Sequence, residues 1–192
     1  MPTPLRTRVC DALGIDVPIL QAGMSTFTSA ELVAAVSNAG GLGILGALLR
    51  PVDELRAEIH RIRARTTRPF GVNHVIAHLD PTALDVTFEE RVPVLSLAWG
   101  DPAPLTARAH AAGVRVVHQV ATVADAAQAA AAGVDVIVGQ GTDGGATSAS
   151  SARWRSCPRS STRRAASRSS PRAGSPTAAA SPPRWRSAPT AS

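Results

Sequence analysis

The sequence of 192 residues contains no tyrosine and no lysine, and only 3% of its residues are aromatic. Because lysine and tyrosine have AT-leaning codons, the simplest explanation of their absence is a very GC-rich gene. The two cysteines, Cys10 and Cys157, are far apart and match no metal or redox spacing, so we expect unpaired thiols and no metal site. The first residues lack the apolar stretch of a signal peptide, and the most apolar segment, 31–49, contains Glu31 and four glycines. We therefore expect a cytoplasmic protein with no membrane span.

The net charge of +6 is unevenly distributed along the chain. Residues 1–145 hold 11 Arg and all 14 acidic residues, which gives −3, whereas residues 146–192 hold nine Arg and no acid, which gives +9. A basic chain ordinarily suggests nucleic acid or an anionic membrane as a partner, and nucleic-acid binding through this tail, with strong salt dependence, is one alternative. Trp154 and Trp185 are the only aromatic residues of the tail, which argues against base stacking. We expect neither nucleic acid nor a membrane as a partner.

Six short apolar runs recur along residues 1–145. They are rich in Val, Ile and Leu and do not alternate with polar residues, which is typical of strands buried on both faces of a parallel sheet. The runs are VPIL (17–20), LGIL (42–45), PFGV (69–72), VPVLSL (92–97), VRVV (114–117) and VDVIV (134–138).

Ala-rich segments between these runs predict helices, among them 29–40, 51–65 and 122–133. Ser29 is the expected N-cap of the first, Pro51 suits the first turn of the second, and Thr122 and Asp125 form a capping-box-like pair in the third. Three helices end in Ala-Gly directly before a strand, where glycine adopts the left-handed conformation; these glycines are 40, 113 and 133.

Strand–helix units repeat roughly every 20–28 residues in this part of the chain. Such a repeat predicts parallel strands with right-handed crossovers. We expect an α/β fold that consists of about the first six units of a (β/α)8 TIM barrel over residues 1–145. A complete barrel usually needs about 250 residues. A doubly wound open sheet of six strands is the rival architecture.

Residues 146–192 differ in character from the rest. Ser, Ala, Arg and Pro fill 39 of the 47 positions without a hydrophobic period, so the segment, taken literally, is a disordered basic tail. If the codons of residues 151–192 are read in a shifted frame, however, they can encode a regular pattern. The pattern is a helix, a buried strand, a glycine turn, a second helix and the start of a strand. Restoring one lost G turns DGGAT (143–147) into DGGGH. We therefore expect that the segment is read out of frame.

Three motifs follow predicted strands, where the loops of an α/β barrel build its active site. LQAGM (20–24) is a small-residue turn that lets the backbone approach a planar ligand closely. In GVN (71–73), the Asn73 amide can donate to and accept from a ligand's polar edge. VIVGQGTDGG (136–145) places Gln140 at the mouth of the barrel and leaves glycine amides free to meet an anion or a flavin ring. The first two motifs also fit ordinary turns.

Three histidines lie near these motifs. His74 and His78 are four residues apart, but no third ligand is evident, so we interpret them as solvated or capping residues rather than a metal pair. His118, beside Gln119 at the end of a predicted strand, is a candidate second base, although a packed or hydrogen-bonded role fits it better.

Four segments, taken together and in this order, resemble the nitronate monooxygenase family, also called 2-nitropropane dioxygenase-like proteins. They are LGIDVPILQAGM, SNAGGLGILGA, PFGVN and AAGVDVIVGQGTDGG. The resemblance covers nearly all of residues 10–145. It implies a TIM barrel that binds FMN non-covalently and oxidises alkyl nitronates with molecular oxygen. It also implies six flavin-contacting residues, of which the first three line the ring, the next two hydrogen-bond it and the last packs near it: Ala22, Gly23, Met24, Asn73, Gln140 and Gly145.

The family's glycine-rich motif continues into a Gly-His pair whose histidine is the proposed catalytic base, whereas this chain has Ala146 and Thr147. No catalytic residue is therefore carried over, and the histidine reappears only in the restored frame. The FMN phosphate is expected in the loops after the seventh and eighth strands, and the chain as given lacks both loops. A six-strand fragment also leaves open sheet edges and an uncovered interior. We expect the chain to fold poorly, to bind FMN weakly or not at all, and to be inactive, as a gene relic would be. An FMN-dependent enoyl-acyl-carrier-protein reductase, which shares the glycine turn, is the close alternative.

Overall fold

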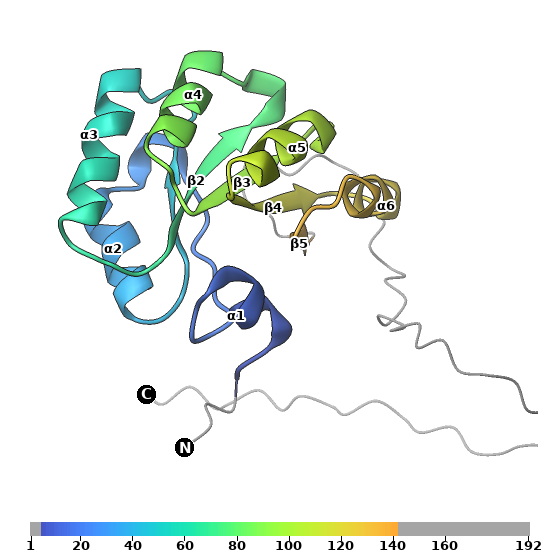
Figure 1. The fold of residues 1–192 in the computed structure, drawn as a ribbon, viewed down its shortest axis with the longest axis horizontal. Helices are drawn as coiled ribbons and strands as arrows, with labels where there is room; N and C mark the ends of the chain where they lie inside the picture. Colours follow the sequence, from blue (N-terminus) through green and yellow to red (C-terminus); the bar gives the residue numbers. More distant parts are fainter. Residues whose placement is uncertain (1–4, 142–192) are drawn as a thin grey trace, which may run out of the picture. The chain divides into compact units, whose positions relative to one another are not determined.

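A computed structural model describes residues 5–141, and residues 1–4 and 142–192 lie outside the described part. The tail predicted over 146–192 and the predicted site residue Gly145 are therefore outside it. The described residues form a parallel sheet flanked by helices (Figure 1). Its strands are β1 (Gly43–Gly46), β2 (Phe70–Val75), β3 (Val94–Ala98), β4 (Arg115–Val120) and β5 (Val136–Gly139). The α-helices are α1 (Arg8–Leu13), α2 (Ala30–Asn38), α3 (Val52–Arg63), α4 (Pro81–Glu89), α5 (Ala103–Ala111) and α6 (Val123–Ala131), with 3-10 turns η1 (Ser25–Phe27) and η2 (Ile76–His78).

The strand order decides between the two predicted architectures. The order is β1-β2-β3-β4-β5, and each strand is parallel to its neighbour. A doubly wound sheet reverses its order at a switch point, whereas a barrel adds each new strand on the same side as the last. The described residues are therefore part of a TIM barrel.

The first predicted strand, 17–20, is not a strand of this sheet. Leu20 alone pairs, in an isolated parallel bridge with Leu42. Pro18 has no N–H to contribute to a ladder, which keeps the pairing short. The side chain of Gln21 continues it, because its Oε1 accepts from the Ile44 N–H at 3.2 Å and its Nε2 donates to the Ile44 carbonyl at 3.3 Å. Six predicted strands thus become five strands and a bridge.

One face of the sheet carries the apolar contacts to the helices. A row of fully buried side chains, paired across four neighbouring strands, lies on this face: Leu45, Val72, Leu95 and Val116. The β1 and β2 residues pack with α2, α3 and α4, and the β3 and β4 residues pack with α4 and α5 (Figure 1). Burying each such side chain contributes about 1.5–3 kcal/mol, so this face supplies much of the stability.

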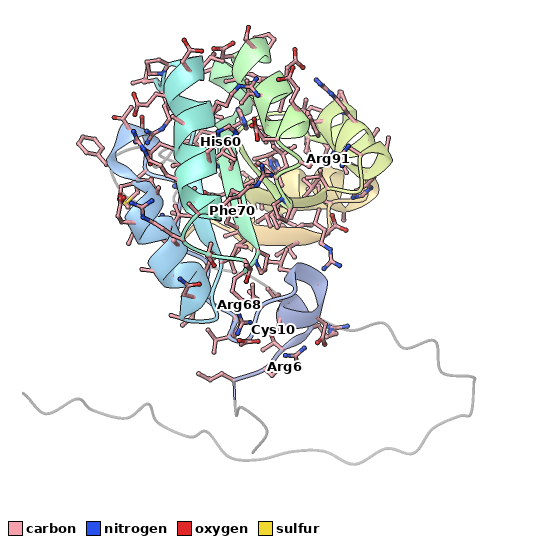
Figure 2. All side chains as sticks on the ribbon, turned by 60° about the vertical axis from the view of Figure 1, so that its left-hand side comes forward. Arg6, Cys10, His60, Arg68, Phe70 and Arg91 are labelled. Atoms are coloured by element: carbon pink, nitrogen blue, oxygen red, sulfur yellow. The ribbon has the colours of Figure 1, made fainter. Side chains whose placement is uncertain are left out.

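The opposite face lines the interior of the barrel. At its amino-terminal end, Cys10 and Leu13 of α1 pack against Ile44, Val94 and Val117. Figures 1 and 2 show α1, with the labelled Cys10, beyond this end of the strands. The short helix thus covers the bottom of the interior and leaves the carboxyl ends of the strands for a site.

The predicted helix signals are confirmed except at Pro51. Gly40, Gly113 and Gly133 have φ values of 91°, 71° and 78°, the left-handed region that favours glycine. Ser29 accepts from the Leu32 N–H, and Thr122 and Asp125 form the full capping box. Pro51 is the N-cap residue of α3 rather than part of its first turn.

Candidate functional site

A cavity of about 180 Å³ lies on the inner face of the sheet, toward the carboxyl ends of the strands. Two rows of paired residues build its wall. The first row crosses the sheet through Asn73, Ser96 and Val117, and the second runs through Val75, Ala98, Gln119 and Val138. The full lining is Leu20, Ala22, Gly23, Ile44, Asn73, Val75, Ser96, Ala98, Val117, Gln119 and Val138.

The wall is mostly apolar, with three polar side chains that do not titrate near neutral pH. Asn73 donates through Nδ2 to the Ser96 hydroxyl at 3.2 Å and to the Ser96 carbonyl at 3.4 Å. Within the described residues its amide oxygen makes no hydrogen bond, so it can accept one from a ligand. Gln119 supplies a second amide. Among residues 5–141, no Asp, Glu, His, Cys or Arg lines the cavity. This wall can therefore bind and orient a ligand but cannot carry a proton for it.

Glycine is required where the loop after Leu20 meets the wall. A Cβ on Gly23 would lie 2.6 Å from the Cβ of Asn73, and one on Gly46 would lie 2.5 Å from the backbone nitrogen and oxygen of Ser25. Side chains cannot fit at such distances. The loop backbone therefore lies directly against the end of β2, and this close approach brings Ala22 and Gly23 to the cavity beside Asn73.

Three of the six predicted cofactor residues, Ala22, Gly23 and Asn73, line this cavity together. Met24 does not line it and is 46% exposed. Gln140 follows β5 and is buried, with its backbone N–H donating to the Val120 carbonyl at 2.9 Å. Gly145 lies outside the described residues.

Sequence reasoning missed Ser96 and did not assign a face to Gln119. Ser96 lies in the middle of an apolar run whose two faces are both buried, so no alternation marked it. The available signal was the register, because Ser96 pairs with Asn73. In the sequence, this signal is a polar residue inside the apolar run that forms the strand after that of Asn73.

His118 lies on the other face of the sheet from the cavity. Residues of a strand alternate between faces, and both Val117 and Gln119 face inward, so His118 faces outward. It is 2% exposed, its Nδ1 has no hydrogen-bond partner among residues 5–141, and burial lowers its pKa. The packed interpretation fits this arrangement, and the interpretation as a second base for a ligand in the cavity does not.

The interpretation of His74 as a solvated or capping residue is wrong. Its side chain is buried between β2 and α4, with Nε2 2.8 Å from the Thr87 hydroxyl, and burial lowers its pKa to about 4. His78 is exposed in η2. Within residues 5–141, no group of three or more His, Cys, Asp or Glu residues could hold a metal ion. No helix in that range is long and apolar enough to cross a membrane.

The family model for nitronate monooxygenase matches residues 6–83. A carboxyl-CoA dehydrogenase of Mycobacterium tuberculosis, (3aS,4S,5R,7aS)-5-hydroxy-7a-methyl-1-oxo-octahydro-1H-indene-4-carboxyl-CoA dehydrogenase, is 38% identical over 73% of this chain and 40% of its own length. The nitronate monooxygenase of Paraburkholderia phytofirmans is 34% identical over 69% of this chain and 47% of its own length.

Among solved structures, FabK from Thermotoga maritima is similar at a TM-score of 0.67 and 38% sequence identity. The match covers 71% of this chain and 44% of that protein. In all three comparisons the chain spans less than half the length of the relative.

Proposed function

The chain belongs to the nitronate monooxygenase family, and from that premise we propose that its described residues form one wall of an FMN site in an oxidoreductase. The proposed reaction is the oxidation of an alkyl nitronate by molecular oxygen. The observation that carries the proposal is the cavity at the carboxyl ends of the strands, where the glycine-containing loop meets Asn73. This is the end of a TIM barrel at which active sites are built.

The residues present fit one side of a flat heteroaromatic ring. Val75, Val117 and Val138 offer an apolar surface, and Asn73 and Gln119 offer amides for polar ring edges. FMN, when bound, accepts the electrons that leave the substrate. Ala22 and Gly23 would let the backbone approach the ring, and Asn73 would hydrogen-bond it. Gln140, Met24 and Gly145 remain proposed contacts on the strength of the family resemblance.

The phosphate of FMN needs a different set of groups. The described residues bring no basic side chain to the cavity, so they would hold the ring rather than the phosphate. Barrels that bind phosphate groups commonly do so in the loops after the seventh and eighth strands, and the five described strands do not include them. This supports a site that the described residues provide only in part.

A second candidate function is a flavin-dependent oxidoreductase of thioesters, such as an enoyl-acyl-carrier-protein reductase on the same barrel. The observation that favours it is the similarity to a dehydrogenase named for a carboxyl-CoA compound, at 38% identity. The two candidates differ in the electron acceptor and donor. Oxygen consumption with a nitronate indicates the first, and NAD(P)H consumption with an enoyl thioester indicates the second.

We further propose that residues 146–192 are read out of frame and that the histidine expected as the base is lost with them. The support is compositional: nine arginines and no acidic residue follow a body with 11 arginines and 14 acidic residues. The chain as it stands would then be inactive and would bind FMN weakly.

The test compares two proteins: the 192-residue chain, and the product of a gene with one G added in the codons of Gly144 and Gly145. Bound flavin, oxygen consumption with propane-2-nitronate and NAD(P)H consumption with an enoyl thioester are measured for both. We expect flavin and nitronate oxidation in the restored protein alone. Stoichiometric flavin in the 192-residue chain would refute the frame proposal. A restored protein that folds without flavin would refute the assigned function.

A further inference from the structure

Arg50 is a buried arginine four residues after the end of β1, and it contacts both that strand end and the loop before α2. Its side chain is 2% exposed. Nε donates to the Gly46 carbonyl at 3.0 Å, and Nη2 donates to the Thr28 carbonyl at 2.8 Å and the Ser25 carbonyl at 3.4 Å. Nη1 pairs with Glu54, which is half-exposed. The guanidinium thus joins the end of β1 to the segment 22–28, the loop that carries Ala22 and Gly23.

Two further hydrogen bonds hold the same loop. The Ser25 hydroxyl donates to the Leu48 carbonyl at 2.5 Å, and the Met24 N–H donates to the Thr28 hydroxyl at 2.7 Å. Both bonds are local to the loop or to its contact with residue 48. Arg50, by contrast, lies outside the loop and donates charge-assisted hydrogen bonds to two of the loop's carbonyls.

The backbone is strained on both sides of this contact. Ser25 has φ 49° and Leu49 has φ 59°, and neither is glycine. A non-glycine residue in this region costs of order 1–3 kcal/mol and persists only where its surroundings hold it. The Ser25 carbonyl accepts from Arg50, and Leu49 directly precedes it. Leu49 is also 83% exposed, so its own side chain does little to hold this conformation.

We propose that Arg50 is a positioning residue that holds segment 22–28 against the end of β2 in the geometry needed for ligand binding. It does not touch the cavity itself, so it acts through the loop. A lysine cannot replace it, because one ammonium group cannot reproduce a planar fork of donors to carbonyls of two segments and to Glu54. The part of the inference that concerns FMN rests on the proposed function, whereas the part that concerns the loop does not.

The test uses the 192-residue chain and Arg50→Lys, with amide hydrogen exchange followed by mass spectrometry. We expect exchange in segment 22–28 to accelerate about tenfold, while exchange in β3 and β4 stays within about twofold. Val116→Ala is the matched control, because it removes core volume from β4 without touching the loop. It is expected to lower the unfolding midpoint while leaving segment 22–28 no more exposed than the rest of the chain.

A milder variant keeps the test decisive if Arg50→Lys does not fold. Glu54→Gln removes only the ion pair from a half-exposed position, and we expect it to accelerate exchange selectively in segment 22–28 by about threefold. Uniform acceleration across the fold, or none in that segment, in every Arg50 or Glu54 variant that folds would overturn the inference.

A second measurement separates this inference from the proposed function. FMN titrated to millimolar concentration, followed by quenching of its fluorescence, gives a dissociation constant for each variant. We expect the constant to rise about tenfold in Arg50→Lys and to stay unchanged in Val116→Ala. An unchanged constant beside a loosened loop would overturn the role in ligand binding. If no protein, including the restored-frame product, binds FMN, the proposed function fails, and the exchange data still decide whether Arg50 holds the loop.

Discussion

Protonation of His74 is expected to make this fold sensitive to mild acid. Its Nε2 lies 2.8 Å from the Thr87 hydroxyl, and burial lowers its pKa from 6.5 to about 4. Thr87 donates its only hydroxyl hydrogen to the Ala83 carbonyl at 3.0 Å, so the hydroxyl must accept from His74. The neutral ring with hydrogen on Nε2 is therefore the form that the structure holds, and protonation would place a charge in an apolar layer.

The size of the effect follows from the two pKa values. The unfolded chain binds this proton near pH 6.5, whereas the native chain binds it only near pH 4. The unfolded state is therefore favoured as the pH falls, and stability decreases. The loss from this group begins below pH 6.5, reaches about 2 kcal/mol at pH 5 and levels off at about 3 kcal/mol below pH 4.

Urea unfolding followed by circular dichroism at pH 7, 6 and 5 tests this prediction. His74→Gln should lose about 2 kcal/mol less stability than the parent chain between pH 7 and pH 5. His78→Gln, the same change at an exposed position, should keep the parent's pH dependence. Carboxylates and the buried His118 titrate in all three proteins, so their contribution cancels in the comparison. Equal pH dependence in the parent and in His74→Gln would refute the reasoning.

Three further substitutions test the local structure by urea or thermal unfolding. Arg91, labelled in Figure 2, follows the C-cap of α4 and has φ 47°, where three other helices have a left-handed glycine. Arg91→Gly should therefore stabilise the fold by about 1 kcal/mol, and a lower midpoint would contradict this. Gly46→Ala places a Cβ 2.5 Å from Ser25 backbone atoms and should cost more than about 2 kcal/mol, whereas an unchanged midpoint would show that the loop yields. Thr122→Ala removes the capping box with Asp125 and should cost about 1 kcal/mol, and no loss would mean that solvent replaces the cap.

The elements that the sequence predicts correctly depend on neighbouring residues alone. The left-handed glycines 113 and 133 and the Thr122–Asp125 box are local signals, and each is found in the structure. Strand existence also followed from short apolar runs, with the exception of 17–20. There the hydrophobic content is right, but Pro18 and the lack of further pairing partners leave only the bridge at Leu20.

The faces of the strands could not be predicted in the same way. A strand buried on both faces shows no alternation, so VPVLSL does not reveal that Ser96 faces the cavity. The same limit explains the wrong interpretation of His74. It directly follows Asn73, but it points to α4 rather than to solvent, because the outer face of this strand is covered by a helix. Long-range packing decides both cases, and no local pattern encodes it.

The position of one residue is sufficient to assign every face in β4. Val117 belongs to the interior apolar cluster that includes Leu13 of α1, so alternation places Gln119 inward and His118 outward. Ser96 pairs with Val117, and Asn73 pairs with Ser96, so both of these residues also face inward. The inward positions that result carry amides and a hydroxyl and no group that exchanges a proton near neutral pH. A reaction in this cavity that needs a base must therefore draw it from residues other than those of the described wall.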